Sequence, residues 1–503
     1  MIRYKSEKQL IIEEFRTPFE MNLQKDNRWV VLAEKLPWDE LAAIYHRSLS
    51  PSMGAPAKDA RLVIGALIIK HTLGLDDRET IETIRENIYI QYFLGLCDYT
   101  YQDVFDRSLF TTLRYRMGED KFDEMTCELI KLADMSKDGQ KKQKKQDNTP
   151  KTNPGDPVEK TEDLLENKGK LLLDATVADQ MIIYPTDFGL VATSRQESER
   201  IIDVICEKLT IKQKPRTYRR NARKAYLELA KKKHKTKKEI RKGIGKQLRF
   251  LRRNIKSIHG LLDKAENQPF PLDARDQKIF FIIQHILDQQ MGMYLNRTHS
   301  TEDRIVNIYQ PYVRPIVRGK DKVQVEFGAK IGVSLVDGYA RIDTLSWNAY
   351  NESTDLIKQV EAYKDLKGCY PEVVIVDKIY GTRDNRSYLK NHGIRFCGKQ
   401  LGRPAKETLT PYQKLKQKIE RGIRNQIEGK FGQGKNAYNL SKVRTRTAKT
   451  SESWIACIVF IMNLIKFNQD FLCNFFIGWK KWVTICFFNQ IHCESKIPCP
   501  IPV

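Results

Sequence analysis

Apolar residues recur at helical spacing in the first part of the chain. In residues 60–75, ARLVIGALIIKHTLGL, they return every three or four positions, which predicts a helix that ends at Gly74. A second helix is predicted over DDRETIETIREN, because Asp76 can cap its start and Glu79 can complete a capping box. The two helices match a helix-turn-helix in outline, although an ordinary helical hairpin packed on its own core is the favoured interpretation.

The pattern changes sharply after residue 135. Residues 136–168 are predicted to be a disordered basic linker. From about residue 136 to residue 163 the segment has almost no apolar side chains, so it cannot bury a core. Residues 212–256 are helix-like and hold twenty Lys or Arg against Glu228 and Glu239 only. Such a helical region is either solvated or binds along the phosphates of a nucleic acid. Its unbalanced positive charge favours binding to DNA, because the cations repel one another unless a partner neutralises them.

From residue 324 the hydrophobic pattern becomes that of strands. VQVEFGAKIGVSLVDGYARIDTLSW alternates and contains a hairpin-like turn at VDGYA. An amphipathic helix, the buried strand PEVVIVD, a short helix and the strand IRFCG follow. We therefore expect an all-α N-terminal domain followed by an α/β domain.

Two acids stand where apolar strands end. Asp174 closes LLLD and Asp377 closes VVIVD, and ligand sites of α/β sheets form at such ends. A single Asp there more often caps the next helix, but two in one domain favour a site. A third acid, Glu428, would share one helix face with Arg424 and Lys435, unless these residues form only a surface ion pair.

The helix assumption around Glu428 is weakened by Gly429, Gly432 and Gly434. The same glycines would let another backbone, such as a DNA strand, come close. They also make residues 429–436, GKFGQGKN, look like a phosphate-binding ATPase loop. That interpretation fails on context, because no apolar strand precedes the loop and Asn436 lacks the hydroxyl that ligates Mg²⁺.

Composition narrows the class of partner. The chain has 503 residues and a formal net charge of +24, which favours nucleic acid over a ribosomal or membrane-surface role. The longest apolar run, residues 454–467, is too short and too interrupted at Asn463 to span a bilayer, so a buried helix is predicted. Ten cysteines without a C-x-x-C pair indicate reduced cytoplasmic thiols rather than a zinc or redox site.

Three carboxylates suit one particular chemistry. Phosphodiester cleavage needs an activated water and a stabilised leaving oxygen, and two Mg²⁺ ions ~3.5–4 Å apart can supply both. Mg²⁺ prefers hard oxygen ligands, so carboxylates and substrate phosphate complete its coordination without His or Cys. Asp174, Asp377 and Glu428 are therefore the candidate metal ligands.

The sequence resembles bacterial insertion-sequence transposases of the DDE type, in the IS-four/IS-five superfamily. The resemblance is carried by LPWDELAAIYHRSLSPSMGAPAKDARLVIGALIIK, FDRSLFTTLRYRMG, LLLDATVADQMIIYPTD, YPEVVIVDKIYGTRDNRSYLKNHGIRFCGKQLGRP and RNQIEGKFGQGKNAYNL. The family's third motif is tyrosine, two residues, arginine, three residues, glutamate, six residues, lysine. Arg424, Glu428 and Lys435 match it, whereas Arg421 stands at the tyrosine position.

The resemblance implies a ribonuclease-H-like catalytic domain over residues 169–468, with a basic helical insertion at about 194–287. It implies Asp174, Asp377 and Glu428 as catalytic, metal-binding acids, with Arg424, Lys435 and Arg421 as DNA-phosphate contacts. The cofactor would be two Mg²⁺ ions, with Mn²⁺ as a substitute.

The implied partners are double-stranded DNA, as terminal inverted repeats and target, and a second copy of the chain in a homodimer on the element ends. Residues 1–135 would bind those ends. The expected location is the bacterial cytoplasm and nucleoid, with no membrane. Residues 469–503, aromatic and Cys-rich, are atypical and indicate either a decaying element or a packing segment.

Other functions remain open at this point. A Mg²⁺-dependent nuclease without strand transfer would use the same acids. A non-catalytic basic nucleic-acid-binding protein would use them only as helix caps, and an inactive transposase copy would have lost the reaction.

Overall fold

The computed structural model describes residues 22–47, 49–50, 56–146, 166–265, 269–317, 325–398 and 410–470. Two sequence predictions therefore lie wholly or largely outside the described residues. These are residues 147–165 of the expected linker and the tail from residue 471 onward.

Short helices build the N-terminal domain. They are α1 (Arg28–Lys35), α2 (Trp38–His46), α3 (Ala60–Leu73), α4 (Asp77–Glu86) and α5 (Ile88–Phe93). The predicted end of α3 is confirmed, because Gly74 adopts the left-handed conformation with φ 71°. The predicted capping box of α4 is also confirmed, since Asp76 accepts from the Glu79 backbone N–H while the Glu79 side chain accepts from that of Asp76.

The long helix α6 (Leu109–Gln146) corrects part of the linker prediction. It bends at Gly118, whose φ of 63° and ψ of −169° are not helical, and then continues to residue 146. Residues 136–146 are therefore helical rather than the start of a disordered linker. Lys and Gln dominate that stretch, and their straight side chains lose little rotamer freedom in a helix.

One mixed sheet forms the centre of the second domain. Its strands are β1 (Lys170–Asp179), β2 (Arg314–Val317), β3 (Val325–Val336), β4 (Tyr339–Ser346), β5 (Val373–Ile375) and β6 (Arg395–Cys397). The order is β2-β3-β1-β5-β6, and β4 also pairs with β3. Since β1 pairs antiparallel with β3 and parallel with β5, it lies where the direction of pairing changes.

Helices cover both faces of this sheet. Alternate residues of β1 divide between two cores, so Leu171 and Leu173 pack with α11 (Leu356–Lys367) and α12 (Arg383–Asn391). Leu172 belongs to the opposite core, which also contains Ile427 of α13 (Pro411–Ala437). The short 3-10 turns η3 (Glu352–Asp355) and η4 (Lys378–Tyr380) complete the domain.

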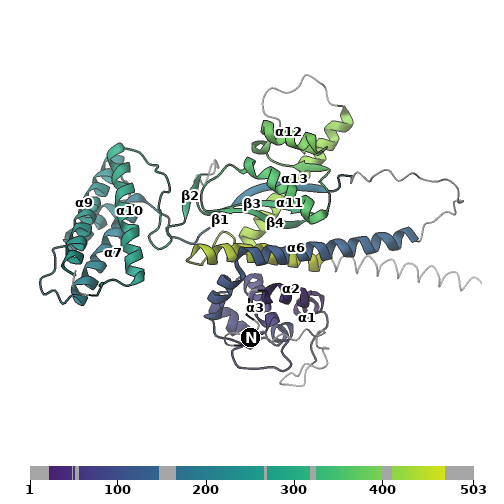
Figure 1. Cartoon of the computed structure of the whole chain (residues 1–503), viewed down its shortest axis with the longest axis horizontal. Coiled ribbons are helices and arrows are strands. Elements are labelled where there is room, and N and C mark those ends of the chain that lie inside the picture. Colours follow the sequence, from purple (N-terminus) through teal and green to yellow (C-terminus); the bar gives the residue numbers. More distant parts are fainter. Residues whose placement is uncertain are drawn as a thin grey trace, which may run out of the picture.

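A helical module is inserted between β1 and β2. It consists of α7 (Asp187–Lys208), α8 (Arg219–Ala230), α9 (Lys237–Leu262), η2 (Asp263–Ala265) and α10 (Ala274–Asn296). These helices share a core of their own and stand to one side of the sheet (Figure 1). The basic helix α9 is not solvated all round, because Leu248, Leu251 and Ile258 bury one face in that core.

The predicted buried helix at residues 454–467 is confirmed within the helix Ala448–Asp470, drawn in yellow beside α6 (Figure 1). This helix is long and apolar enough to cross a membrane, but 78% of its most apolar window is buried inside the protein. Asn463, which interrupts the apolar run, is fully buried and exchanges hydrogen bonds of 2.9 and 2.6 Å with the backbone of Ala340. The polar side chain thereby joins the helix to β4.

Candidate active site on the sheet face

Asp174 does not end its strand, as the sequence predicted, but lies in the middle of β1, which continues to Asp179. It is on the face that α13 covers. It is two residues from Leu172, so period-two alternation directs both side chains to the same side of the sheet. Its side chain is only 16% exposed. A carboxylate at this depth is unusual, because burial penalises the charged form unless cations or donors surround it.

The register of the parallel strands brings Asp377 beside Asp174. Leu172 pairs with Ile375, the last residue of β5, so Asp174 and Asp377 each lie two residues beyond this pair, and both approach Arg424. Neighbouring strands lie about 4.8 Å apart, so the two acids are close although they are distant in sequence. Asp377 also caps η4, since its carboxylate accepts from the Lys378 backbone N–H at 2.7 Å.

The helix α13 supplies the third acid. It continues unbroken through all three glycines that weakened the helix assumption, so Arg424, Glu428 and Lys435 share one helical face. Residues 429–436 are part of this helix, which rules out a phosphate-binding loop there. Glu428 is half-exposed.

The guanidinium of Arg424 joins the three acids. Its Nη2 atom lies 3.4 Å from Asp174 Oδ2, 3.9 Å from Asp377 Oδ2 and 3.2 Å from Glu428 Oε1. Because all three oxygens approach the same nitrogen atom, they also lie close to one another. Two metal ions ~3.5–4 Å apart with their ligands span a comparable length.

Burial raises the pKa of Asp174 above its ordinary value. The backbone N–H of Ala175 and the charge of Arg424 oppose this shift, while Glu352 and Asp377 add to it. The single arginine thus leaves the carboxylates incompletely neutralised, and the site favours additional positive charge.

Sequence reasoning missed one ion pair near Asp174. Lys330 of β3 lies 2.9 Å from Glu352, and both side chains are more than four-fifths buried. A signal was present in the sequence, because Lys330 interrupts the apolar strand EFGAKIGVSLV at a position where burial requires a partner.

The structure places the predicted phosphate contact Lys435 away from the three acids. Its Nζ lies 3.8 Å from Asp179 Oδ2 and 3.6 Å from Glu326 Oε1, near the far end of β1. Arg421 belongs to α13, but its side chain lies outside the described part of the structure.

The donor set fits a hard divalent cation. Three carboxylates gather around one point, and carboxylate oxygen is the ligand type that Mg²⁺ prefers. Among the described residues, no three His, Cys, Asp or Glu side chains are already arranged to hold a metal ion. Arg424 instead occupies the centre of the acids, so a bound cation would have to share or take over its place.

Comparison with known families gives two matches. Residues 374–465 match the transposase DDE domain, and residues 18–116 match a transposase domain described as DUF772. The first match contains Asp377, Arg424, Glu428 and Lys435, whereas Asp174 lies upstream of it. Both matched models describe transposase domains, one in each half of the chain.

A curated relative is the uncharacterized protein ORF8 in the nfe locus of Rhizobium meliloti. It is 30% identical over 122 residues, which is 24% of this chain and 57% of that protein. The match thus spans little more than half the length of the relative. No solved structure matches the chain.

Proposed function

We propose that the chain is a DDE transposase of the IS-four/IS-five superfamily that cleaves the ends of an insertion sequence and joins the freed 3′-hydroxyl to target DNA. The observation that carries this proposal is the approach of Asp174, Asp377 and Glu428 to one nitrogen of Arg424. These acids come from three separate segments: β1, the residues that follow β5, and α13.

The sheet order supports a ribonuclease-H-like catalytic domain. An antiparallel set, β1, β3 and β4, is followed by the parallel strands β5 and β6 on the other side of β1. This arrangement puts β1, which carries Asp174, beside β5, which ends two residues before Asp377.

Each acid would have a distinct role in holding the cations. Asp174, buried and fixed by the Ala175 N–H at 2.8 Å, would be the rigid ligand, with Asp377 beside it. Glu428 is half-exposed and would complete the ligand set from the helix. Bound Mg²⁺ would activate water and stabilise the leaving oxygen. Arg424, released from the carboxylates, would then be free to contact a DNA phosphate.

Two further contacts extend the proposed DNA path. Lys435 would hold a phosphate beyond the acids, in exchange for its present partners Asp179 and Glu326. The exposed cations of α8 and α9 would hold the DNA backbone in a salt-dependent manner. A homodimer on paired element ends is part of the same proposal.

The test is cleavage of duplex DNA that carries the inverted repeats flanking the coding region. Asp377→Asn removes a charge but keeps the side-chain volume, so we expect at least a ~100-fold loss of cleavage with DNA binding retained. Asp384→Asn, an exposed acid at the start of α12, is the matched control. If both variants cleave like the unmodified protein, the acids serve only as caps.

A joining assay separates the transposase from a simple nuclease. DNA with a pre-cut 3′ end is mixed with the protein and an unrelated target duplex. The transposase joins the two molecules, whereas a nuclease without strand transfer gives only shorter fragments.

A further inference from the structure

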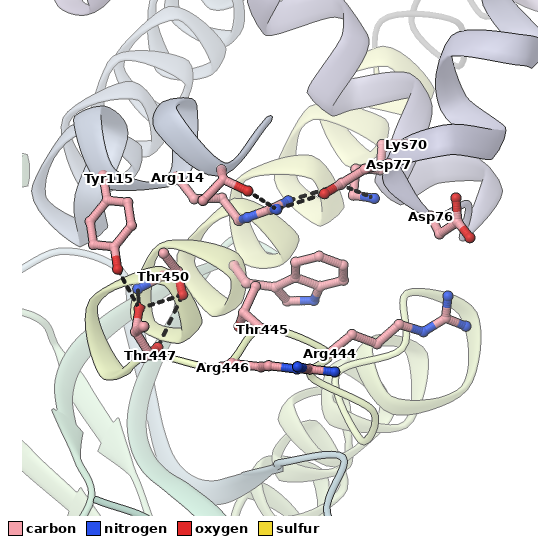
Figure 2. Close-up of a pocket in the computed structure, with 12 residues that line it drawn as sticks. Lys70, Asp76, Asp77, Arg114, Tyr115, Arg444, Thr445, Arg446, Thr447 and Thr450 are labelled. Atoms are coloured by element: carbon pink, nitrogen blue, oxygen red, sulfur yellow. Dashed lines mark hydrogen bonds and ion pairs between the residues drawn. The ribbon is translucent and has the colours of Figure 1, made fainter. Parts of the chain in front are cut away.

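A second cluster of positive charge lies between the N-terminal helices and the sheet domain. There the protein forms an open pocket of about 300 Å³ that is lined by residues of both domains. Figure 2 shows Lys70, Asp77 and Arg114 along one side of the pocket and Arg444 and Arg446 along the other.

The inner side holds two deeply buried cations. Lys70 is 1% exposed and Arg114 is 9% exposed, and both pair with Asp77, at 2.8 and 2.7 Å. Asp77 neutralises only one of the two. The other carboxylate that lines the pocket, Asp76, accepts the backbone N–H groups of the α4 capping box. Four cations thus face two carboxylates, and both carboxylates are already engaged.

Two buried donors in this pocket have no acceptor. Neither Trp454 Nε1 nor Arg114 Nε has a hydrogen-bond partner within the described part of the chain. Both residues line the pocket, and Trp454 is only 7% exposed. A buried donor without a partner costs about 1–3 kcal/mol, and an acceptor that reached either nitrogen would relieve that cost.

The outer side adds two exposed cations and the positive end of a helix. Arg444 and Arg446 are exposed, and neither forms an ion pair with another described residue. Thr447, also in the lining, caps the helix Ala448–Asp470 by accepting the Thr450 N–H at 3.4 Å. The positive end of that helix therefore faces the same space and favours an anion.

We propose that this pocket binds a phosphate group of the DNA backbone. The buried guanidinium, the indole N–H and the two exposed arginines all donate, which matches an anion that only accepts. The choice of DNA as the source of that phosphate rests on the proposed function. A phosphate held here would contact both domains at once and fix the N-terminal helices against the catalytic sheet.

The experiment measures the affinity of the full chain for a duplex oligonucleotide over a series of NaCl concentrations. Arg444→Gln with Arg446→Gln removes the outer cations, and Trp454→Phe removes one donor while keeping a ring beside Lys70. The matched control is Lys442→Gln with Lys449→Gln, which removes the same charge from exposed positions of the same segment outside the pocket.

The arginine pair is expected to weaken binding and to reduce the slope of log K against log[salt] by about 1 relative to the lysine pair. Trp454→Phe is expected to weaken binding several-fold with the slope unchanged, because it removes no charge. Thermal unfolding of each variant is measured to check that the fold is retained. The inference is overturned if the arginine pair binds with the affinity and slope of the lysine pair and Trp454→Phe binds like the unmodified protein.

This outcome is separable from a failure of the proposed function. If the unmodified protein binds duplex DNA and Asp377 is needed for cleavage, unchanged binding by the pocket variants rejects the pocket alone. If the unmodified protein neither binds nor cleaves DNA, both proposals fail.

Discussion

At the scale of single residues, the most distinctive feature of the site is Asp174, a carboxyl group whose pKa is raised by burial. Asp174 must be ionised to bind a cation, and its raised pKa moves the loss of the charged form to a higher pH than for an ordinary Asp. We expect Mn²⁺ affinity, measured by titration at several pH values, to fall as the pH drops through this raised value. Affinity that stays constant down to the ordinary Asp range would contradict the assignment.

The same shift predicts an effect on stability. Because the folded-state pKa of Asp174 lies above the unfolded one, the free energy of unfolding falls as the pH rises from the unfolded pKa to the folded pKa. Asp174→Asn should therefore raise the unfolding midpoint at neutral pH and lose this advantage in acid below the ordinary Asp range. Thermal unfolding at both pH values measures the difference. Asp384→Asn should not raise the midpoint, because the Asp384 carboxylate lies in the first turn of α12, where negative charge favours the helix.

Arg424 is expected to compete with metal for the acids. Its Nη2 lies 3.2 to 3.9 Å from the three carboxylates, so Arg424→Gln removes the internal cation that neutralises them. We expect tighter Mn²⁺ binding together with weaker cleavage, since the arginine no longer contacts phosphate. Weaker Mn²⁺ binding in this variant would show that the arginine supports the site instead of competing for it.

At the scale of elements, α13 carries a glycine on the face of the site. Gly432 lies four residues after Glu428 and three before Lys435, and a Cβ there would meet nothing within 4 Å. Gly432→Ala should stabilise the helix by about 0.5–1 kcal/mol and yet reduce cleavage if a DNA strand passes close. Gly422→Ala, equally open in the same helix, should stabilise without reducing cleavage.

The sequence predicted those elements whose signals are local. The α4 capping box, the end of α3 at Gly74 and the buried helix around Trp454 each followed from neighbouring residues. The approach of Asp174 and Asp377 required the parallel register of β1 and β5, which no local pattern encodes. For the same reason sequence reasoning missed the pairing of Lys435 with acids at the far end of β1, and the pocket that contains Trp454.

Helical periodicity did not reveal which face of α9 is buried. The charge of residues 212–256 concealed the apolar stripe of α9, because its leucines and isoleucines are outnumbered by cations on the other faces. Tertiary packing against α7 and α10 decides which face is buried, and that information lies outside the segment.

At the scale of the whole molecule, positive charge is concentrated on exposed positions of the inserted module. Arg249, Arg253 and Lys256 lie outside the buried face of α9, at helical spacing. Replacing all three with Gln should flatten the slope of log K against log[salt] for DNA binding by about 0.9 for each phosphate that α9 no longer neutralises. The unfolding midpoint should fall only slightly, because these side chains lie outside the module's core and only Arg253 packs over a ring, that of Tyr218 at 4.6 Å.

The most direct test of the central claim is the binding of Mn²⁺ to the full chain, followed by electron paramagnetic resonance in the absence of DNA. The unmodified protein should bind the ion, whereas Asp174→Asn, Asp377→Asn and Glu428→Gln should each weaken binding at least about tenfold. Asp384→Asn should leave it unchanged. Equal Mn²⁺ binding by all five proteins would contradict a shared cation site formed by these acids.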